Sequence, residues 1–239
     1  MRVDGLDEAA VAPWASVLDD AERDRARRFI QPRNRVEYRA AHVLARQALA
    51  AATGHPPAAF RFEAGAHGKP TAWIGAAPAG IHFNLSHTTG AVALAVAPFE
   101  LGFDIELIDR TVDQGVADRY FCPPEIAWLN SLPPPERDEG FIRLWTLKEA
   151  FIKATGSGLS QALDSFWFEV FPPVIHFAAA IADDPAAWRF EQRLIHGKFL
   201  AAIGFRRPAT PVAWRQVEPD ALSGIIGTAA PIPARSAMG

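Results

Sequence analysis

Helix-like patterns of apolar and polar residues come first along the chain. Residues 20–30 form one such pattern, with Asp19 or Asp20 as its N-cap. A longer pattern over residues 33–53 repeats apolar side chains every three or four positions and stops at Gly54. The sequence therefore predicts two successive helices before the first strand.

Runs typical of strands and further helices follow. The first strand-like runs lie at residues 60–64, 81–85, 91–97 and 101–107. Helical patterns return at about 112–120, 123–132 and 136–154. The last strand-like runs lie at 165–170, 174–181, 188–195, 199–205 and 212–217. Helices followed by strands thus occur twice, which predicts an α+β fold with two lobes joined near Ala97–Leu101.

The pattern weakens toward the C-terminus. We expect an N-terminal α+β lobe over residues 1–98 and a C-terminal α+β lobe over residues 99–218. The last segment, 219–239, contains small residues and proline without a clear period, so we expect a mobile tail.

Composition indicates a soluble globular protein. The 239 residues are 49% hydrophobic and 21% charged, and the formal net charge of −3 argues against nucleic acid or an anionic membrane as the main partner. The single cysteine, Cys122, excludes an internal disulfide, and no apolar run approaches the ~20 residues that span a bilayer. We therefore expect a cytoplasmic protein that acts as a monomer.

Positive charge is concentrated near the start of the chain. Between Arg23 and Arg46 there are eight arginines but only two acidic residues. Such a stretch is most often a solvated helix face, but the planar guanidinium of arginine also matches phosphate geometry. The residues alone leave both interpretations open.

The strand-like run "LGFDIEL" carries two carboxylates. Asp104 and Glu106 are two positions apart, so both side chains point to the same face while Phe103 and Ile105 point to the other. Two adjacent carboxylates repel unless a cation or a proton lies between them, and oxygen ligands of this kind suit Mg²⁺. The alternative is an ordinary exposed acidic strand face.

The predicted helix containing "LWTLKEAFIKATGSGLS" has an unusual stripe. Trp145, Glu149 and Lys153 recur at i, i+4 and i+8, and a glycine pair, Gly156 and Gly158, follows. An ordinary core helix turns its charges outward. The stripe is therefore either a solvated Glu–Lys pair above a buried aromatic residue or part of a polar site.

Polar turns add further candidates. "FNLSHTTG" is interpreted as a strand that runs into a turn, where Ser86 and His87 are available to an anion. A serine hydrolase is not favoured, because no nucleophile-elbow pattern surrounds Ser86. "HGKP" predicts a second turn, which presents Lys69. Each of these features alone is more often incidental than functional.

Together, however, these motifs resemble a known family. "GKP", "FNLSH", "GFDIE" and "LWTLKEAFIKATGSGLS" occur in the order and approximate spacing of the Sfp-type 4′-phosphopantetheinyl transferases. The resemblance implies two similar α+β lobes related by a pseudo-twofold axis, with coenzyme A bound in the cleft between them. It also implies transfer of the phosphopantetheine arm to a serine of an apo acyl, peptidyl or aryl carrier protein, with release of 3′,5′-ADP.

The resemblance further implies roles for particular residues. Asp104, Glu106 and Glu149 are expected to hold Mg²⁺, and Asp104, Glu149 and Lys153 to be catalytic. The residues expected to bind coenzyme A are Lys69, Ser86, His87, Lys148 and Lys153, together with Arg25 and Arg39 from the arginine-rich helices. His87 is expected near the 3′-phosphate, and Arg35 and Arg46 are the alternatives to Arg39 as the arginine that binds phosphate. One departure is Glu22, which stands where some relatives have lysine.

Two other functions stay open at this point. A Mg²⁺-dependent phosphohydrolase acting on coenzyme A or a nucleotide would use the same carboxylates with water as acceptor. A carrier-binding module without catalysis is disfavoured, because the metal carboxylates and both motif lysines are present.

Overall fold

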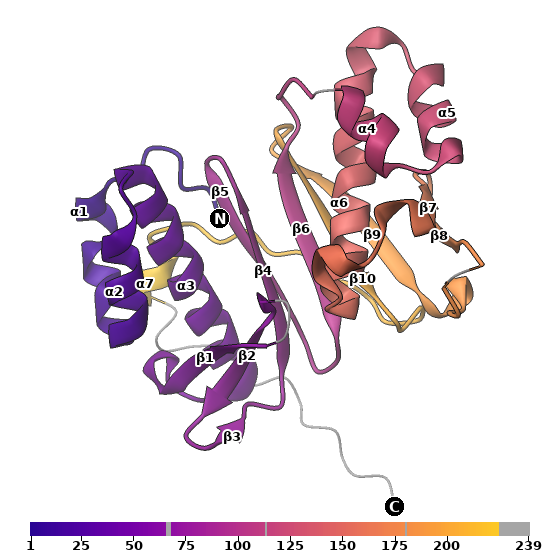
Figure 1. Ribbon diagram of the computed structural model, residues 1–239. Helices are drawn as coiled ribbons and strands as arrows, with labels where there is room; N and C mark the ends of the chain where they lie inside the picture. The colour runs from indigo at the N-terminus through magenta and orange to yellow at the C-terminus, as the bar shows by residue number, and fades with distance from the viewer. Residues whose placement is uncertain (66–67, 113, 180, 225–239) are drawn as a thin grey trace, which may run out of the picture.

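The computed structural model describes residues 1–65, 68–112, 114–179 and 181–224, and its mixture of helices and sheets agrees with the α+β prediction (Figure 1). His67 of the predicted "HGKP" turn lies outside the described residues, as does the tail from residue 225 on. Within the described part, no helix is long and apolar enough to cross a membrane.

Most helices form close to their predicted bounds. α2 (Asp20–Arg28) follows Asp19, whose side chain caps it, and α3 (Pro32–Thr53) ends at Gly54 in the left-handed conformation. The other described α-helices are α1 (Glu8–Val11), α4 (Gln114–Tyr120), α5 (Pro123–Ser131), α6 (Arg137–Thr155) and α7 (Ala221–Gly224). Short 3₁₀ turns lie at Ala12–Val17, Pro57–Ala59, Pro134–Glu136, Gly158–Ser160, Leu163–Ser165 and Pro185–Ala187. The pattern does not predict α1, because four residues carry too little periodicity.

The strands pair in antiparallel fashion within small sheets. The sheet orders are β1-β2-β3, β4-β5, β6-β10-β9 and β7-β8. The first strands are β1 (Phe60–Ala64), β2 (Pro70–Ile74), β3 (Ala77–Pro78), β4 (His82–Thr88), β5 (Ala91–Ala97) and β6 (Leu101–Leu107). The later ones are β7 (Phe166–Glu169), β8 (Val174–Phe177), β9 (Arg189–Ile195) and β10 (Phe199–Phe205). In Figure 1 the hairpin β4–β5 and strand β6 run through the middle of the molecule.

A long helix packs on antiparallel strands in each half of the molecule. α3 lies against β4 and β5, where Val43 and Val92 share one apolar core. α6 lies across β6 and β10, where Phe151 contacts Phe166 within another core. The faces of β5, β6 and β10 turned away from these helices meet in a third core that contains Phe103. The carboxylate strand β6 is therefore central to the molecule.

The structure departs from the predicted elements in further places, among them β2 and β3, which form where no strand was predicted. β4 continues to Thr88, so Ser86 and His87 lie in a strand and not in the turn that was expected. Residues 212–217 form no strand, although Trp214 packs against Phe103. The described part of the predicted mobile tail is packed: α7 lies beside α3 in Figure 1, and Leu222 is buried against it.

Candidate active site

The candidate site lies where α6 crosses β6, and a glycine makes this crossing possible. A Cβ atom at Gly102 would lie 1.9 Å from the Ala150 carbonyl oxygen and 2.3 Å from the Ala154 amide nitrogen. Only glycine therefore lets the helix lie directly on the strand at this point. The close approach brings the Lys153 ammonium within 2.6 Å of Asp104 Oδ1. Two segments far apart in the sequence thus meet in one ion pair.

β4 supplies a third side of the site. Its side chains alternate, so Phe83 and Leu85 face the α3 side, while Ser86 faces β6. The Ser86 hydroxyl donates to Asp104 Oδ1 at 2.8 Å and receives a hydrogen bond from Lys153 at 3.2 Å. Ser86 therefore contacts the predicted catalytic residues directly, as part of the wall that holds Asp104.

The three predicted metal carboxylates influence one another. Burial raises the pKa of Glu106, and the negative charge of Asp104 raises it further. Burial also raises the pKa of Glu149, where Lys153 opposes the shift while Asp104 and Glu106 add to it. Asp104 itself is 4% exposed, so it is not part of an exposed acidic face. Concentrated negative charge in a partly dry site favours a cation or a proton.

One carboxylate oxygen of this group has no hydrogen-bond partner among the described residues. Asp104 Oδ2 is buried and accepts no hydrogen bond from any residue that the structure describes. A buried carboxylate oxygen without a partner is costly and uncommon. Within the described ranges no three His, Cys, Asp or Glu side chains stand close enough together to hold a metal ion. Asp104, Glu106 and Glu149 supply carboxylate oxygens of the kind that Mg²⁺ prefers, but they are not gathered around one point, and Lys153 is the cation that contacts Asp104.

Lys148, one residue before Glu149, is placed differently from the expectation that it binds coenzyme A. It is fully buried, and its ammonium lies 2.8 Å from Glu125 and 2.7 Å from each of the carbonyl oxygens of Leu163 and Phe166. Burial lowers the pKa of Lys148 and raises that of Glu125, while their mutual attraction opposes both shifts. The structure therefore corrects this assignment, because the ammonium faces the core of the C-terminal half.

Lys69 belongs to the loop between β1 and β2, and its side chain lies against the C-terminal end of α6. Its ammonium forms an ion pair with Glu100 and hydrogen bonds to the carbonyl oxygens of Leu101, at 3.2 Å, and Ala154, at 3.4 Å. Beside it is a cavity of about 270 Å³ lined by residues of the β1–β2 loop, β4 and Gly156. Glu100 also contacts His82 at 3.0 Å. Sequence reasoning missed Glu100, which stands alone between two strands and belongs to no motif.

The remaining predicted ligands belong to the N-terminal half. His87 is exposed and points away from Ser86, as neighbours on a strand do. Arg39 lies 3.7 Å from Glu8, and the exposed Arg25 lies over the Tyr38 ring at 5.9 Å. Arg25 also lines a second cavity, of about 570 Å³, with residues of α2. Among the described contacts, none joins His87, Arg25 or Arg39 to the carboxylate group.

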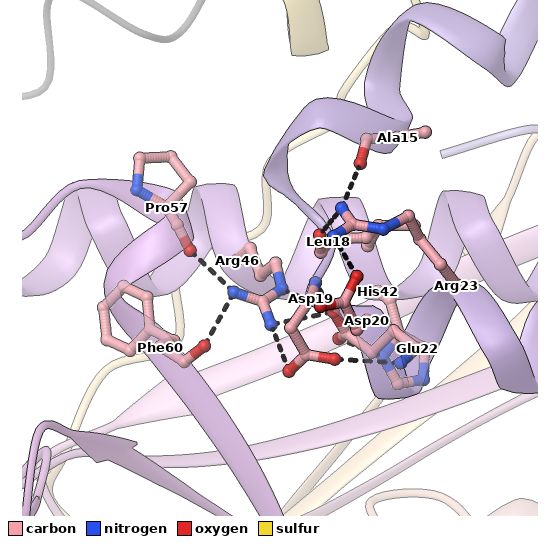
Figure 2. Close-up of polar contacts among 10 residues, drawn as sticks. All are labelled: Ala15, Leu18, Asp19, Asp20, Glu22, Arg23, His42, Arg46, Pro57 and Phe60. Atoms are coloured by element: carbon pink, nitrogen blue, oxygen red, sulfur yellow. Dashed lines mark hydrogen bonds and ion pairs between the residues drawn. The ribbon is translucent and has the colours of Figure 1, made fainter.

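Figure 2 shows that Glu22 is engaged by Arg46 and His42. Arg46 is completely buried and lies 2.7 Å from Glu22 and 3.0 Å from Asp19. Its other nitrogen donates to the carbonyl oxygens of Pro57 and Phe60. Burial alone would raise the pKa of Glu22, but hydrogen bonds from His42 and Arg46 outweigh it and hold that pKa below its usual value. This network joins α2 to α3 and to the start of β1.

Comparison with known proteins agrees with these motifs. Residues 100–204 match the family described as the 4′-phosphopantetheinyl transferase superfamily, and residues 8–99 match the family described as 4′-phosphopantetheinyl transferase, N-terminal. HetI of Nostoc sp., a 4′-phosphopantetheinyl transferase, is 35% identical over 64% of this chain and 66% of its own. A 4′-phosphopantetheinyl transferase of Bacillus subtilis is 38% identical over 61% of this chain and 63% of its own. The matched region thus spans slightly less than two thirds of these relatives.

Proposed function

The chain belongs to the 4′-phosphopantetheinyl transferase superfamily, and from this premise we propose that it transfers the phosphopantetheine arm of coenzyme A to a serine of an apo carrier protein. One juxtaposition carries the proposal: the motif strand β6 and the motif helix α6 meet through Lys153 and Asp104, with Ser86 completing the contact. Such a reaction needs cations at a pyrophosphate and a base for an incoming hydroxyl, but no nucleophile of the enzyme itself.

Asp104, Glu106 and Glu149 would hold Mg²⁺ in this proposal. Burial and the charge of Asp104 raise the pKa values of Glu106 and Glu149, and one buried oxygen of Asp104 has no partner among the described residues; both observations fit a divalent cation. Bound there, Mg²⁺ would supply positive charge against the pyrophosphate oxygens. Lys153, which contacts Asp104, would neutralise a phosphate of coenzyme A.

Glu149 has a second candidate role, alternative to that of metal ligand: it is the base that accepts the proton of the carrier serine. Its pKa is raised, which brings the carboxylate closer to the basicity that proton transfer near neutral pH requires. The serine oxygen would form a bond to the phosphorus of the phosphopantetheine arm, and the bond to 3′,5′-ADP would break. The proton would pass to Glu149, and 3′,5′-ADP would leave among the cations of the site.

Coenzyme A is proposed to lie in a cleft between two lobes related by a pseudo-twofold axis. The packing of α3 on β4–β5 and of α6 on β6–β10 supports two similar lobes. The cavity beside Lys69 lies at the end of α6 and suits the nucleotide part of the ligand. His87, Arg25 and Arg39 would contact the 3′-phosphate from the N-terminal half, where positive charge is plentiful.

The test uses the intact protein, coenzyme A, Mg²⁺ and a panel of apo carrier proteins. Transfer adds one phosphopantetheine mass to a carrier, and mass spectrometry detects it directly. Asp104→Ala should lower the rate on the order of 10³-fold, because it removes a ligand of the proposed metal and the partner of Lys153. Release of 3′,5′-ADP without modification of any carrier would favour the phosphohydrolase and overturn the proposal.

A further inference from the structure

The contact between β4 and β6 is made by side chains. Each strand forms its backbone ladder with another partner, β4 with β5 and β6 with β10. The edge of β6 that faces β4 donates its amides to β4 side chains. The three bonds are Phe103 to Asn84 Oδ1 at 3.0 Å, Ile105 to Ser86 Oγ at 3.4 Å and Leu107 to Thr88 Oγ1 at 3.3 Å. We call these three contacts the β4–β6 seam.

The seam has a regular spacing. Donor and acceptor are 19 residues apart in every case, and successive contacts advance by two residues on both strands. The two strands therefore run alongside each other in one fixed register, and side chains of one face of β4 take the place of backbone acceptors. This register also fixes where the other side chains of β4 lie relative to those of β6.

Each of the two hydroxyls in the seam also donates a hydrogen bond to a carboxylate of β6. Ser86 donates to Asp104 at 2.8 Å, and Thr88 donates to Glu106 at 3.1 Å. A hydroxyl has one proton to donate and can accept two hydrogen bonds. In both cases it accepts from one β6 amide and donates to the carboxylate one residue earlier. At the third position the earlier residue is Gly102, where α6 passes.

We infer that Thr88 is a positioning residue that orients Glu106 toward the proposed metal, as Ser86 orients Asp104; this inference rests on the proposed function. The Leu107 amide fixes the Thr88 oxygen, so its single proton is directed at the Glu106 carboxylate. Arg110 lies 3.6 Å from the same carboxylate oxygen, but its side chain is 42% exposed and less restrained. Thr88 lies in a strand, and its β-branched side chain has few rotamers.

The experiment compares three variants of the full chain. Thr88→Val keeps the shape and removes the hydroxyl, and Thr88→Ser keeps the hydroxyl. Thr89→Val makes the same chemical change one residue later, in the exposed turn, and is the matched control. Binding of Mn²⁺ is measured by the electron paramagnetic resonance signal of free Mn²⁺, without coenzyme A or carrier. Thermal unfolding shows whether each variant is folded, and Thr88→Ala replaces Thr88→Val if the latter is not.

Thr88→Val should weaken Mn²⁺ binding about tenfold, the effect of losing one hydrogen bond to a charged group. Thr88→Ser and Thr89→Val should bind as the wild type does. In the transfer assay, Thr88→Val should need about tenfold more Mg²⁺ for half-maximal rate while kcat at saturating Mg²⁺ changes little. A role limited to fold stability would not produce this split.

Two outcomes separate this inference from the proposed function. Equal Mn²⁺ affinity in Thr88→Val and wild type, with normal Mg²⁺ requirement, would overturn the positioning role and leave the transferase intact. If the wild type binds Mn²⁺ and Thr88→Val binds it more weakly, but the wild type modifies no carrier, the positioning role is supported and the transferase proposal is overturned. A wild type that binds no Mn²⁺ even with coenzyme A present would overturn both.

Discussion

Two lysines on α6, five positions apart, form carboxylate pairs of opposite kinds. Lys148 and Glu125 are both completely buried, and three acceptors surround the three protons of the ammonium. Lys153 is 27% exposed, and it shares Asp104 with Ser86 while the second oxygen of Asp104 has no partner among the described residues. The first pair is saturated and inaccessible, whereas the second is open to exchange. A site that must bind a ligand needs the second kind.

The comparison predicts its largest effect at Lys148. Lys148→Met leaves Glu125 buried without its cation and should lower the free energy of unfolding by about 3–5 kcal/mol. Urea unfolding followed by circular dichroism measures this change. Recovery of most of the loss in the double variant Lys148→Met with Glu125→Leu would support the buried-charge explanation. A stability within 1 kcal/mol of wild type for Lys148→Met alone would contradict it.

Lys153→Met is the matched change at the open pair and should reverse the balance. The ammonium is partly solvated, but Asp104 is buried and keeps only its bond from Ser86, so the unfolding free energy should fall by about 1–3 kcal/mol, less than for Lys148→Met. Transfer should fall on the order of 10²-fold, and coenzyme A should bind more weakly, because the ammonium neutralises phosphate before and during the reaction. Isothermal titration and the carrier-mass assay measure the two quantities. Normal binding and turnover would make Lys153 an ordinary ion-pair residue.

The smallest expected effect is the contribution of Glu149 to the folding stability of the protein. The pKa of Glu149 is raised in the folded protein, so the native state binds more protons than the unfolded one above pH ~4.5, and stability falls as pH rises through the raised pKa. Glu149→Gln removes this cost. In metal-free buffer at pH 7 the variant should therefore unfold at a slightly higher temperature than wild type, with no gain at pH 4. A lower melting temperature at pH 7 would contradict the prediction.

Much of the fold follows from local sequence. α2, α3, β1, β5, β6 and β10 form within two residues of their predicted bounds, because caps, glycine stops and strand alternation act within a few residues. The failure at residues 212–217 is informative. Val212 and Trp214 alternate and pack on the third core, yet the segment is irregular. Alternation reports which face is buried and does not show that a neighbouring backbone is available for pairing.

The candidate site was predictable in its motifs and not in its contacts. The spacing of Asp104 and Glu106 was enough to place both on one strand face, and Trp145 packs against the core as the helical stripe suggests. Glu125, Glu100 and Thr88 were missed, because each acts on a residue that lies far away in the chain or on another strand. The 1–98 and 99–218 lobes, the monomeric state and the cytoplasmic location stay predictions.

The sequence by itself determined the chemistry that is available: carboxylates two apart on a strand, a glutamate and a lysine one turn apart on a helix, and a glycine that ends that helix. These follow from the fixed periods of strand and helix. Only the tertiary structure decided which lysine lies beside the carboxylate group and which supports the core. That choice depends on what α6 packs against on each side: Gly102 admits it to β6 beside Asp104, while Glu125 and two carbonyl groups enclose Lys148. Such partners are supplied by distant segments, so no local pattern specifies them.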